Sequence, residues 1–252
     1  MDQELHECRV ERLGLVPYED AWKLQERLAG EISTGKRLPT LLLLEHPHTY
    51  TFGRRGDAKN LLWDEPELAK RGIGLFWVDR GGDITYHGPG QLVGYPLIPL
   101  GKPDPRNRNP SLVDYVGFVR NIEATLISSL ARFGLAAGQI AGKTGVWIQP
   151  DVASRCARCD PRLKQAPSKI ASIGVKVDVN GVTRHGFALN VAPDMSYWEG
   201  IIACGLEGVT MASLADLLDP PPAMPEVMQA VEESFAEIFN FQLVRMPNRS
   251  SV

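Results

Sequence analysis

Four consecutive leucines stand at positions 41–44, inside the stretch TLLLLEH of residues 40–46. A strand with one face in solvent alternates apolar and polar residues, but this run places apolar side chains on both of its faces. Such a run is typical of a central strand in a sheet that is buried on both sides. The chain is therefore expected to fold around a sheet, with residues 40–46 near its centre.

The rest of the chain supplies further strands and several helices. Apolar residues at helical spacing predict long helices over 18–33 and 112–134, and shorter ones near 212–218 and 226–239. Strands are expected over 8–16, 75–80, 91–100, 145–149, 169–179, 182–191 and 241–245. Asn180-Gly181 marks a hairpin turn, and the prolines of 91–100 indicate an edge strand or a strand end. This mixture predicts an α/β (α+β) fold with a mixed β-sheet and flanking helices.

Composition and length exclude several classes of protein. The 252 residues suit one large α/β domain or two small ones, and the net charge of −3 excludes a globally basic nucleic-acid binder. The polar, acidic N-terminal residues lack the pattern of a signal peptide, so none is expected, and every apolar run is too short to cross a bilayer. Four cysteines are too few for a disulfide framework, so a cytoplasmic location with reduced thiols is expected.

The segment RGGDITYHGPGQ, residues 80–91, is too rich in glycine for a helix and too polar for a core strand. A hairpin turn needs only about two to five residues, and it needs no arginine, aspartate, tyrosine or histidine among its glycines. Glycines let the backbone approach a ligand closely and expose N–H groups. The pattern therefore favours a ligand-contacting loop over a plain turn. It matches neither G-x-G-x-x-G nor a Walker A loop, so nucleotide binding gains no support.

Two further residues carry reactive groups in apolar surroundings. Cys204 ends the short apolar run of IIACGLEG, and Lys169 opens the apolar strand expected over 169–179. Each has a structural alternative, a buried thiol for Cys204 and a solvated strand-end charge for Lys169. A thiolate is a strong nucleophile, and a neighbouring cation would increase the thiolate fraction. The pattern alone does not show whether the two residues meet.

Five blocks in one order along the chain resemble a known family. RGGDITYHGPGQLVGYPLIPL, GKTGVWI, KIASIGVKV, HGFALNV and ACGL together are similar to the lipoyl(octanoyl) transferases, over about residues 8–245. The resemblance implies the fold of lipoate and biotin protein ligases. It also implies a single catalytic domain over 1–252, with a large lobe over about 1–195 and a small C-terminal lobe over about 196–252.

The resemblance implies the first step of endogenous protein lipoylation and no cofactor. The donor would be octanoyl-acyl carrier protein. The acceptor would be a lysine on the lipoyl domains of 2-oxoacid dehydrogenases or on the glycine cleavage H protein. Cys204 would accept the acyl group, and Lys169 would activate the thiol and act as acid and base. Substrate-binding residues would be Arg80, Gly81, Gly82, Asp83, Ile84, Thr85, Tyr86, His87, Ser172, Ile173, Gly174, Gly186, Phe187 and Ala188.

Other polar residues have a place near such a site. His87 is expected to form hydrogen bonds within the site. For His185, a direct role in the site and a supporting role behind it fit equally well. His46 and His48 either flank the acyl entrance or belong to a polar loop after a buried strand. Since carrier proteins and lipoyl domains are typically acidic, we expect a positive rim formed by Arg54, Arg55, Lys59, Lys70, Arg71 and Arg80.

The segment over 151–168 departs from the family, whose connection here is usually shorter. It contains the pair Cys156-x-x-Cys159, which is half of a zinc site. His6 and Cys8 would supply the other half only if the N-terminal strand reached this segment. An exposed insertion without metal is the favoured interpretation, and a thioredoxin-like redox pair is the weakest because no strand-to-helix turn follows.

Four other functions compete with octanoyl transfer. An ATP-dependent lipoate or biotin ligase of the same fold would carry a triple-glycine motif, where this chain has two glycines, and would not need Cys204. An enzyme that moves octanoyl between lipoyl-carrying proteins places its cysteine differently. A carrier-protein binding module would tolerate loss of Cys204. A papain-like hydrolase would need a C-G-x-C-W context that is missing here.

Overall fold

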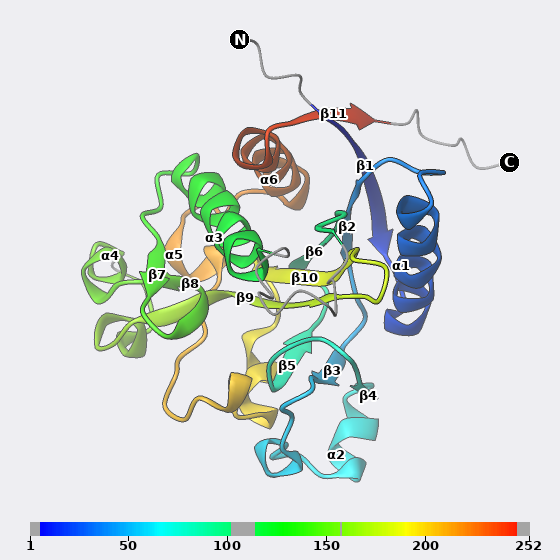
Figure 1. The fold of residues 1–252 in the computed structure, drawn as a ribbon. Coiled ribbons are helices and arrows are strands. Elements are labelled where there is room, and N and C mark those ends of the chain that lie inside the picture. Colours follow the sequence, from blue (N-terminus) through cyan, green and yellow to red (C-terminus); the bar gives the residue numbers. More distant parts are fainter. Residues whose placement is uncertain (1–5, 102–113, 157, 246–252) are drawn as a thin grey trace, which may run out of the picture.

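The computed structural model describes residues 6–101, 114–156 and 158–245, which build two β-sheets and their covering helices (Figure 1). The large sheet has eight strands in the order β11-β1-β2-β6-β10-β9-β8-β7. Pairing is parallel for β11-β1-β2 and antiparallel across the rest, so the predicted mixed sheet is confirmed. In that order the strands are Phe241–Arg245, His6–Leu15, Thr40–Glu45, Gln91–Leu97, Thr183–Asn190, Ser168–Val177, Lys143–Ile148 and Gly138–Ile140.

Helices cover both faces of this sheet. The α-helices are α1 (Tyr18–Ser33), α2 (Glu65–Lys70), α3 (Tyr115–Ala131), α4 (Pro150–Ser154), α5 (Leu214–Leu217) and α6 (Met224–Phe239). Helix α1 lies on one face, and α3 packs with α6 on the other (Figure 1). Residues 112–113, where the second long helix was expected to begin, lie outside the described residues. Among the helices that the structure describes, none combines the length and the apolar character needed to cross a membrane.

Strand β2 shows why the four leucines follow one another. Leu41 and Leu43 face the core formed with α3 and α6, and Leu42 and Leu44 face the core formed with α1. All four side chains are fully buried. Because successive side chains of a strand point to opposite faces, a strand covered on both faces needs an uninterrupted apolar run. The expectation of a central strand is confirmed.

Strand β6 corrects one expectation. It lies between β2 and β10 in the middle of the sheet, so it is not an edge strand. Pro96 is the residue before its last, opposite Leu41 of β2. The proline therefore marks the end of the strand, where one missing N–H donor weakens the ladder least.

A second sheet of three strands, in the order β4-β3-β5, carries the glycine segment. Its strands are Gly74–Trp77, Thr49–Phe52 and Ile84–His87. Residues 84–87 were expected in a loop, but they form a buried strand paired antiparallel with β3, itself not predicted. Ile84 and Tyr86 enter the core of the small sheet, which leaves Thr85 and His87 on the opposite face, toward the large sheet. Because side chains alternate along β5, two residues of the glycine segment pack in the core and two face the pocket between the sheets.

The segment after residue 195 is packed into the main body of the protein. Helix α6 lies against α3, and β11 pairs in parallel with β1 at the edge of the large sheet. The expected division into two lobes near residue 195 stays a prediction. Residues 195–211 instead contribute to the core of the small sheet through side chains such as Trp198, Ile201 and Met211.

Candidate active site

Cys204 and Lys169 meet in the structure. The Lys169 Nζ lies 3.4 Å from the Cys204 Sγ, within hydrogen-bonding distance of sulfur. The Ser172 Oγ lies 4.0 Å from the same sulfur. Distant segments of the chain therefore bring an ammonium and a hydroxyl to one thiol, which is the arrangement that favours a thiolate nucleophile.

The backbone on both sides holds Lys169 in place. It is the second residue of β9, and it donates its N–H to the Thr210 carbonyl while its own carbonyl accepts from the Ala212 N–H, both at 2.9 Å. The side chain is only 3 % exposed and its Nζ lies 5.4 Å from the centre of the Trp147 ring. A buried lysine with its stem packed and its amine directed at sulfur has little freedom to point elsewhere.

The backbone at Cys204 adopts the left-handed conformation, with φ 59° and ψ 17° inside the short 3₁₀ turn Ala203–Gly205. For a residue with a side chain this conformation is uncommon, and it persists where the surroundings enforce it. Asp83 and Asn60 lie against the turn: a Cβ on Gly205 would come within 2.6 Å of the Asp83 Oδ2. The Asp83 carboxylate accepts hydrogen bonds from the Asn60 side chain and the Ile84 N–H, both at 2.6 Å. Asp83 is thus a positioning residue for the cysteine turn.

Gly145 gives Lys169 the space that it occupies. Its φ is +123°, and an added Cβ would lie 2.5 Å from the Lys169 Cε. We expect Gly145→Ala to lower the rate of the acyl transfer that the family resemblance implies about 10-fold to 100-fold, because it displaces the amine from the sulfur. Gly142→Ala is the matched control: its φ is +76°, but no atom lies within 4 Å of the added Cβ. Rates and unfolding midpoints of both variants are measured, and equal rates for the two would contradict the assignment.

A cavity of about 1020 Å³ contains both the thiol and the amine. Residues of α3, of the β7–β8 hairpin, of β9 and of the glycine segment form its walls. Its cationic lining residues are Arg55, Arg120, Lys143 and Lys169, its carboxylates are Asp83 and Glu123, and its larger apolar residues are Val116, Val119, Ile140, Ile173, Val175 and Leu206. The volume is that of a site for a small-molecule group, with apolar walls and a few polar groups near the reactive atoms.

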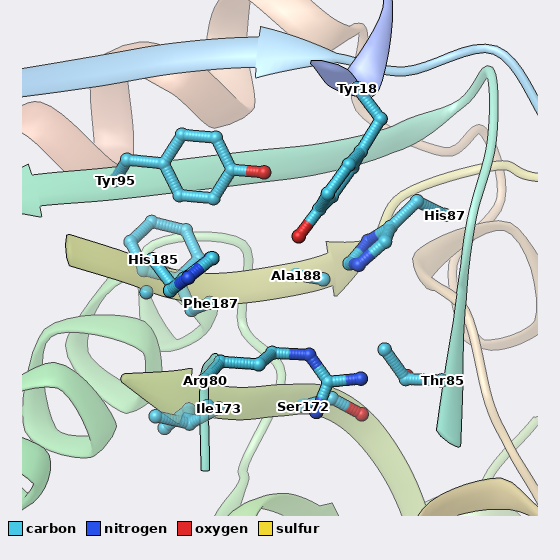
Figure 2. Close-up of a pocket in the computed structure, with 12 residues that line it drawn as sticks. Tyr18, Arg80, Thr85, His87, Tyr95, Ser172, Ile173, His185, Phe187 and Ala188 are labelled. Atoms are coloured by element: carbon cyan, nitrogen blue, oxygen red, sulfur yellow. The ribbon is translucent and has the colours of Figure 1, made fainter. Parts of the chain in front are cut away.

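A second pocket of about 30 Å³ lies between the two sheets (Figure 2). Tyr18 and Tyr95 reach it from α1 and β6, and Arg80 and His87 reach it from the glycine segment. Among the described residues, the Thr85 Oγ1 and the His185 Nδ1 have no hydrogen-bond partner. The size of this pocket suits one water molecule, and its polar walls would form hydrogen bonds with that water. The remaining lining residues are Ser172, Ile173, Gly174, Gly186, Phe187 and Ala188.

The predicted substrate-binding residues thus divide between two neighbouring cavities. Gly81, Gly82 and Asp83 line the large one, and Ile173 and Gly174 line both. The small cavity is lined by the remaining predicted residues of β5, β9 and β10, which are Thr85, His87, Ser172, Gly186, Phe187 and Ala188. Ile84 and Tyr86 line neither cavity and belong to the core of the small sheet. The Arg80 guanidinium is buried and donates to the Thr51 carbonyl at 2.6 Å. Burial lowers the pKa of Arg80, and nearby negative charge, including that of an ionised Cys204, opposes this.

His185 lines the small pocket and is held by Asp79. Its Nε2 donates to the Asp79 Oδ1 at 2.7 Å, and the hydrogen bond from His185 lowers the pKa of that carboxyl below its usual range. Burial lowers the pKa of His185, so the neutral imidazole is the donor. Lys176 and Arg184 also bind Asp79 and balance its charge.

His46 and His48 do not flank an entrance, and neither lines the two cavities. His46 is fully buried; its Nδ1 donates to the Val16 carbonyl at 2.7 Å and its Nε2 accepts from the Tyr95 hydroxyl at 2.7 Å. His48 stacks on Tyr197, with ring centres 3.9 Å apart. His46 therefore orients a tyrosine of the small pocket from behind.

The buried histidines predict a loss of stability in acid. Burial lowers the pKa of His46 from 6.5 to about 4, whereas the unfolded chain takes up this proton near pH 6.5. The stabilisation is fully present above pH 6.5 and is lost as the pH falls toward 4, by about 3 kcal/mol for this residue. Burial also lowers the pKa of His87 and His185, which adds to the same loss.

Urea unfolding at a series of pH values measures this effect. His46→Gln should flatten the fall in unfolding free energy between pH 6.5 and 4, while replacement of the exposed His6 by glutamine should leave it unchanged. An identical pH dependence in the wild type and His46→Gln would show that His46 is not responsible.

The structure bears on two clusters named from the sequence, the expected positive rim and the disfavoured zinc set. Arg80 is buried at the site, and Arg71 and Lys70 are paired with Glu67 at 2.6 and 3.5 Å, so these three contribute no free charge to a rim; Arg54, Arg55 and Lys59 remain exposed. Cys8 is buried in β1, which β2, β6 and β10 separate from β9 and the adjoining insertion. The described residues contain no group of three or more side chains arranged to hold a metal.

Several site residues had no signal in the sequence. Tyr18 is simply the first residue of the predicted helix, and Tyr95 lies within a predicted strand. Glu123 lies on α3 and accepts from the Gln139 side chain at 2.8 Å and from the Gly145 N–H at 2.9 Å. The one sequence signal for Glu123 was a charged residue within the apolar pattern of a predicted helix.

Comparisons with solved structures identify the fold. A bipartite lipoate protein ligase from Thermoplasma acidophilum has the same fold: the TM-score is 0.65 at 18 % identity, covering 96 % of this chain and 88 % of the other. A lipoate-protein ligase A bound with ATP aligns with a TM-score of 0.62 at 16 % identity, over 97 % of this chain and 90 % of the other. The fold is therefore that of the lipoate protein ligases, and the predicted fold class is confirmed.

The sequence comparisons are more specific. Residues 17–236 match the lipoyl protein ligase A/B catalytic domain, and the chain belongs to this family. An octanoyltransferase of Chloroflexus aurantiacus is 40 % identical over 91 % of this chain and 93 % of its own length. One from Salinispora arenicola is 42 % identical over 88 % and 92 %. The protein is thus an acyltransferase, and its relatives support octanoyl transfer in protein lipoylation.

Proposed function

We propose that the enzyme transfers an octanoyl group from octanoyl-acyl carrier protein to the lysine of a lipoyl domain, through a thioester on Cys204. The observation that carries this proposal is the 3.4 Å contact between the Lys169 Nζ and the Cys204 Sγ inside the large cavity. A ligase that activates its acid with ATP has no use for a nucleophilic thiol, whereas a two-step transfer from a thioester through an acyl-enzyme uses one.

In the first step the Cys204 thiolate attacks the donor thioester carbonyl. The ammonium of Lys169 stabilises the thiolate, and the buried guanidinium of Arg80 adds positive charge nearby. The new carbon–sulfur bond forms on Cys204 and the bond to the carrier sulfur breaks. Lys169 gives its proton to the departing sulfur and becomes neutral. One thioester replaces another, so the step is close to balanced in free energy.

In the second step the acceptor lysine arrives as an ammonium, since its ordinary pKa is about 10.4. The neutral Lys169 takes one of its protons, and the amine attacks the Cys204 thioester. An amide forms, Cys204 leaves as a thiolate, and the second proton lost by the amine passes to solvent. The ion pair of Cys204 and Lys169 is restored, and the exchange of thioester for amide makes the step downhill.

The large cavity offers the acyl chain an apolar wall beside the sulfur, formed by residues such as Ile173, Val175 and Leu206. Burial of a seven-carbon tail contributes about 5 kcal/mol at about 0.8 kcal/mol for each CH₂. The small pocket holds too little volume for this chain. We therefore assign the tail to the large cavity and the small pocket to the support of Arg80 and Ser172.

The turn at Cys204 limits the choice of oxyanion donors. The Gly205 and Leu206 N–H groups donate to the Ile202 and Ala203 carbonyls at 3.0 and 3.1 Å, so both are used within the turn. We assign stabilisation of the tetrahedral oxygen to other N–H groups on the cavity wall, with those of Cys204 and Gly82 as candidates.

Intact-mass analysis tests the proposal. Wild-type enzyme mixed with octanoyl-acyl carrier protein should gain one octanoyl group that hydroxylamine releases and that an apo lipoyl domain then removes. Formation of an octanoyl-adenylate from octanoate and ATP, without acylation of Cys204, would support the ligase alternative instead and would overturn the thioester route.

The exposed arginines next to the cavity predict how the donor is recruited. Charge reversal of Arg54 and Arg55 to glutamate is expected to raise the KM for acyl carrier protein about 10-fold at low salt and to weaken its salt dependence, because both cations face an acidic partner. Lys36→Glu, an exposed cation after α1, is the control for the change in net charge. An unchanged KM in the double variant would remove these two residues from the docking surface.

A further inference from the structure

The insertion between β8 and β9 contains two thiols that lie side by side. It consists of α4, a loop and the 3₁₀ helix Pro161–Lys164. The Cys156 and Cys159 Sγ atoms both donate to the Asp216 carbonyl, at 3.5 and 2.9 Å. When Cys156 is ionised, its sulfur accepts the S–H of Cys159 in place of the Asp216 carbonyl. Both sulfurs therefore lie close to the Asp216 carbonyl and close to each other.

The two thiols differ in access to solvent. Cys159 is 5 % exposed and packs in the main core with Ala153 and Leu163, whereas Cys156 is only partly buried. The hydrogen bond from Cys159 lowers the pKa of Cys156, and burial raises the pKa of Cys159 to about 12. Small reagents therefore meet Cys156 first, with Cys159 directly behind it.

The Asp216 carbonyl links these thiols to the catalytic lysine. Asp216 lies in α5, and its side chain closes a capping box with Ser213 at the start of that helix. The residues just before Ser213 are the ones that bond to the Lys169 backbone on both sides, through the Thr210 carbonyl and the Ala212 N–H. A change at the thiols therefore reaches Lys169 through one short segment.

We propose that Cys156 and Cys159 are a dithiol that low-molecular-weight disulfides reversibly oxidise, and that oxidation slows acyl transfer through Lys169. The Cys156 thiolate attacks one sulfur of the small disulfide, which forms a mixed disulfide and releases one small thiol. Cys159 then attacks the Cys156 sulfur, the protein disulfide forms, and the second small thiol leaves. The protons of both cysteines pass to the two released thiols. The Asp216 carbonyl loses both S–H donors.

Trypsin offers a direct readout of the pairing, because Arg158 lies between the two cysteines. Full-length Cys204→Ala is incubated with mixtures of reduced and oxidised glutathione, alkylated and digested. We expect the peptides 156–158 and 159–162 to become joined, with the loss of two hydrogen atoms, and to separate again after dithiothreitol. In Cys159→Ser, glutathione should remain attached to Cys156 because the second attack is missing.

Three outcomes would overturn the pairing. Both cysteines could alkylate fully at every glutathione ratio, glutathione could remain on Cys156 in the chain that retains Cys159, or the thiols could react only after a chelator releases a bound metal. Each of these would show that the two sulfurs do not exchange with a small disulfide as proposed.

The effect on transfer is measured in chains that retain Cys204. Wild type and Cys156→Ser are treated with the same oxidised glutathione, since any reaction at Cys204 slows both equally. We expect a further several-fold loss of transfer in the wild type alone, reversed by dithiothreitol. Equal losses in the two chains would overturn the link to Lys169, and the peptide result would be unaffected.

Discussion

Cys204→Ala is expected to lose octanoyl transfer by at least about 10³-fold, because it removes the only atom on which the proposed thioester forms. The substitution leaves the left-handed turn, Lys169 and the cavity lining in place, so the chain should still fold and still bind its donor. Two rates are measured: the gain of octanoyl mass by the enzyme and the appearance of octanoylated lipoyl domain. Both should fall together.

The matched control is Cys156→Ser, which changes another partly exposed thiol away from the cavity lining. Under reducing conditions it should transfer at the wild-type rate. Octanoylated lipoyl domain formed by Cys204→Ala at a rate near that of wild type would refute the covalent route and favour direct attack of the amine on the donor.

Lys169→Met should slow transfer by about 10²-fold to 10⁴-fold, the range of a lost general acid–base group. Methionine fills the buried site between Trp147 and Gly145 with a chain of similar length, so the loss is chemical. Acylation of Cys204 should be slower because the thiolate loses its counter-ion and the leaving sulfur loses its proton donor. Deacylation suffers because no base accepts the proton of the acceptor amine. Rapid-mixing mass measurements follow the two steps separately.

Lys143→Met separates a specific role from general loss of charge. Lys143 also lines the cavity and its Nζ lies 5.5 Å from the centre of the Trp147 ring, close to the value for Lys169. Lys143 is exposed, and of these two lysines it is Lys169 that is hydrogen-bonded to the sulfur. Equal losses in the two variants would mean that cavity charge matters, with no acid–base role for Lys169.

Much of the framework follows from local pattern. The run of four leucines has one interpretation, a strand with both faces covered, and the periodic segments over 18–33 and 226–239 form helices near the expected bounds. The strand over residues 84–87 was not predicted, because the glycines on either side resemble a loop and the strand forms by pairing with β3. Pairing between distant segments has no local signal.

The same division holds at the site. Residue patterns along the chain predicted the fold class and the order of most elements, and the family resemblance pointed to Cys204 and Lys169 as the reactive pair. The folded arrangement was needed to show that their side chains meet, that Asp83 and Asn60 lie against the cysteine turn, and that Tyr18 and Tyr95 reach the small pocket. The physical reason is that a side chain's neighbours come from other strands and helices, and residue identity along one strand does not encode which of these will lie across from it.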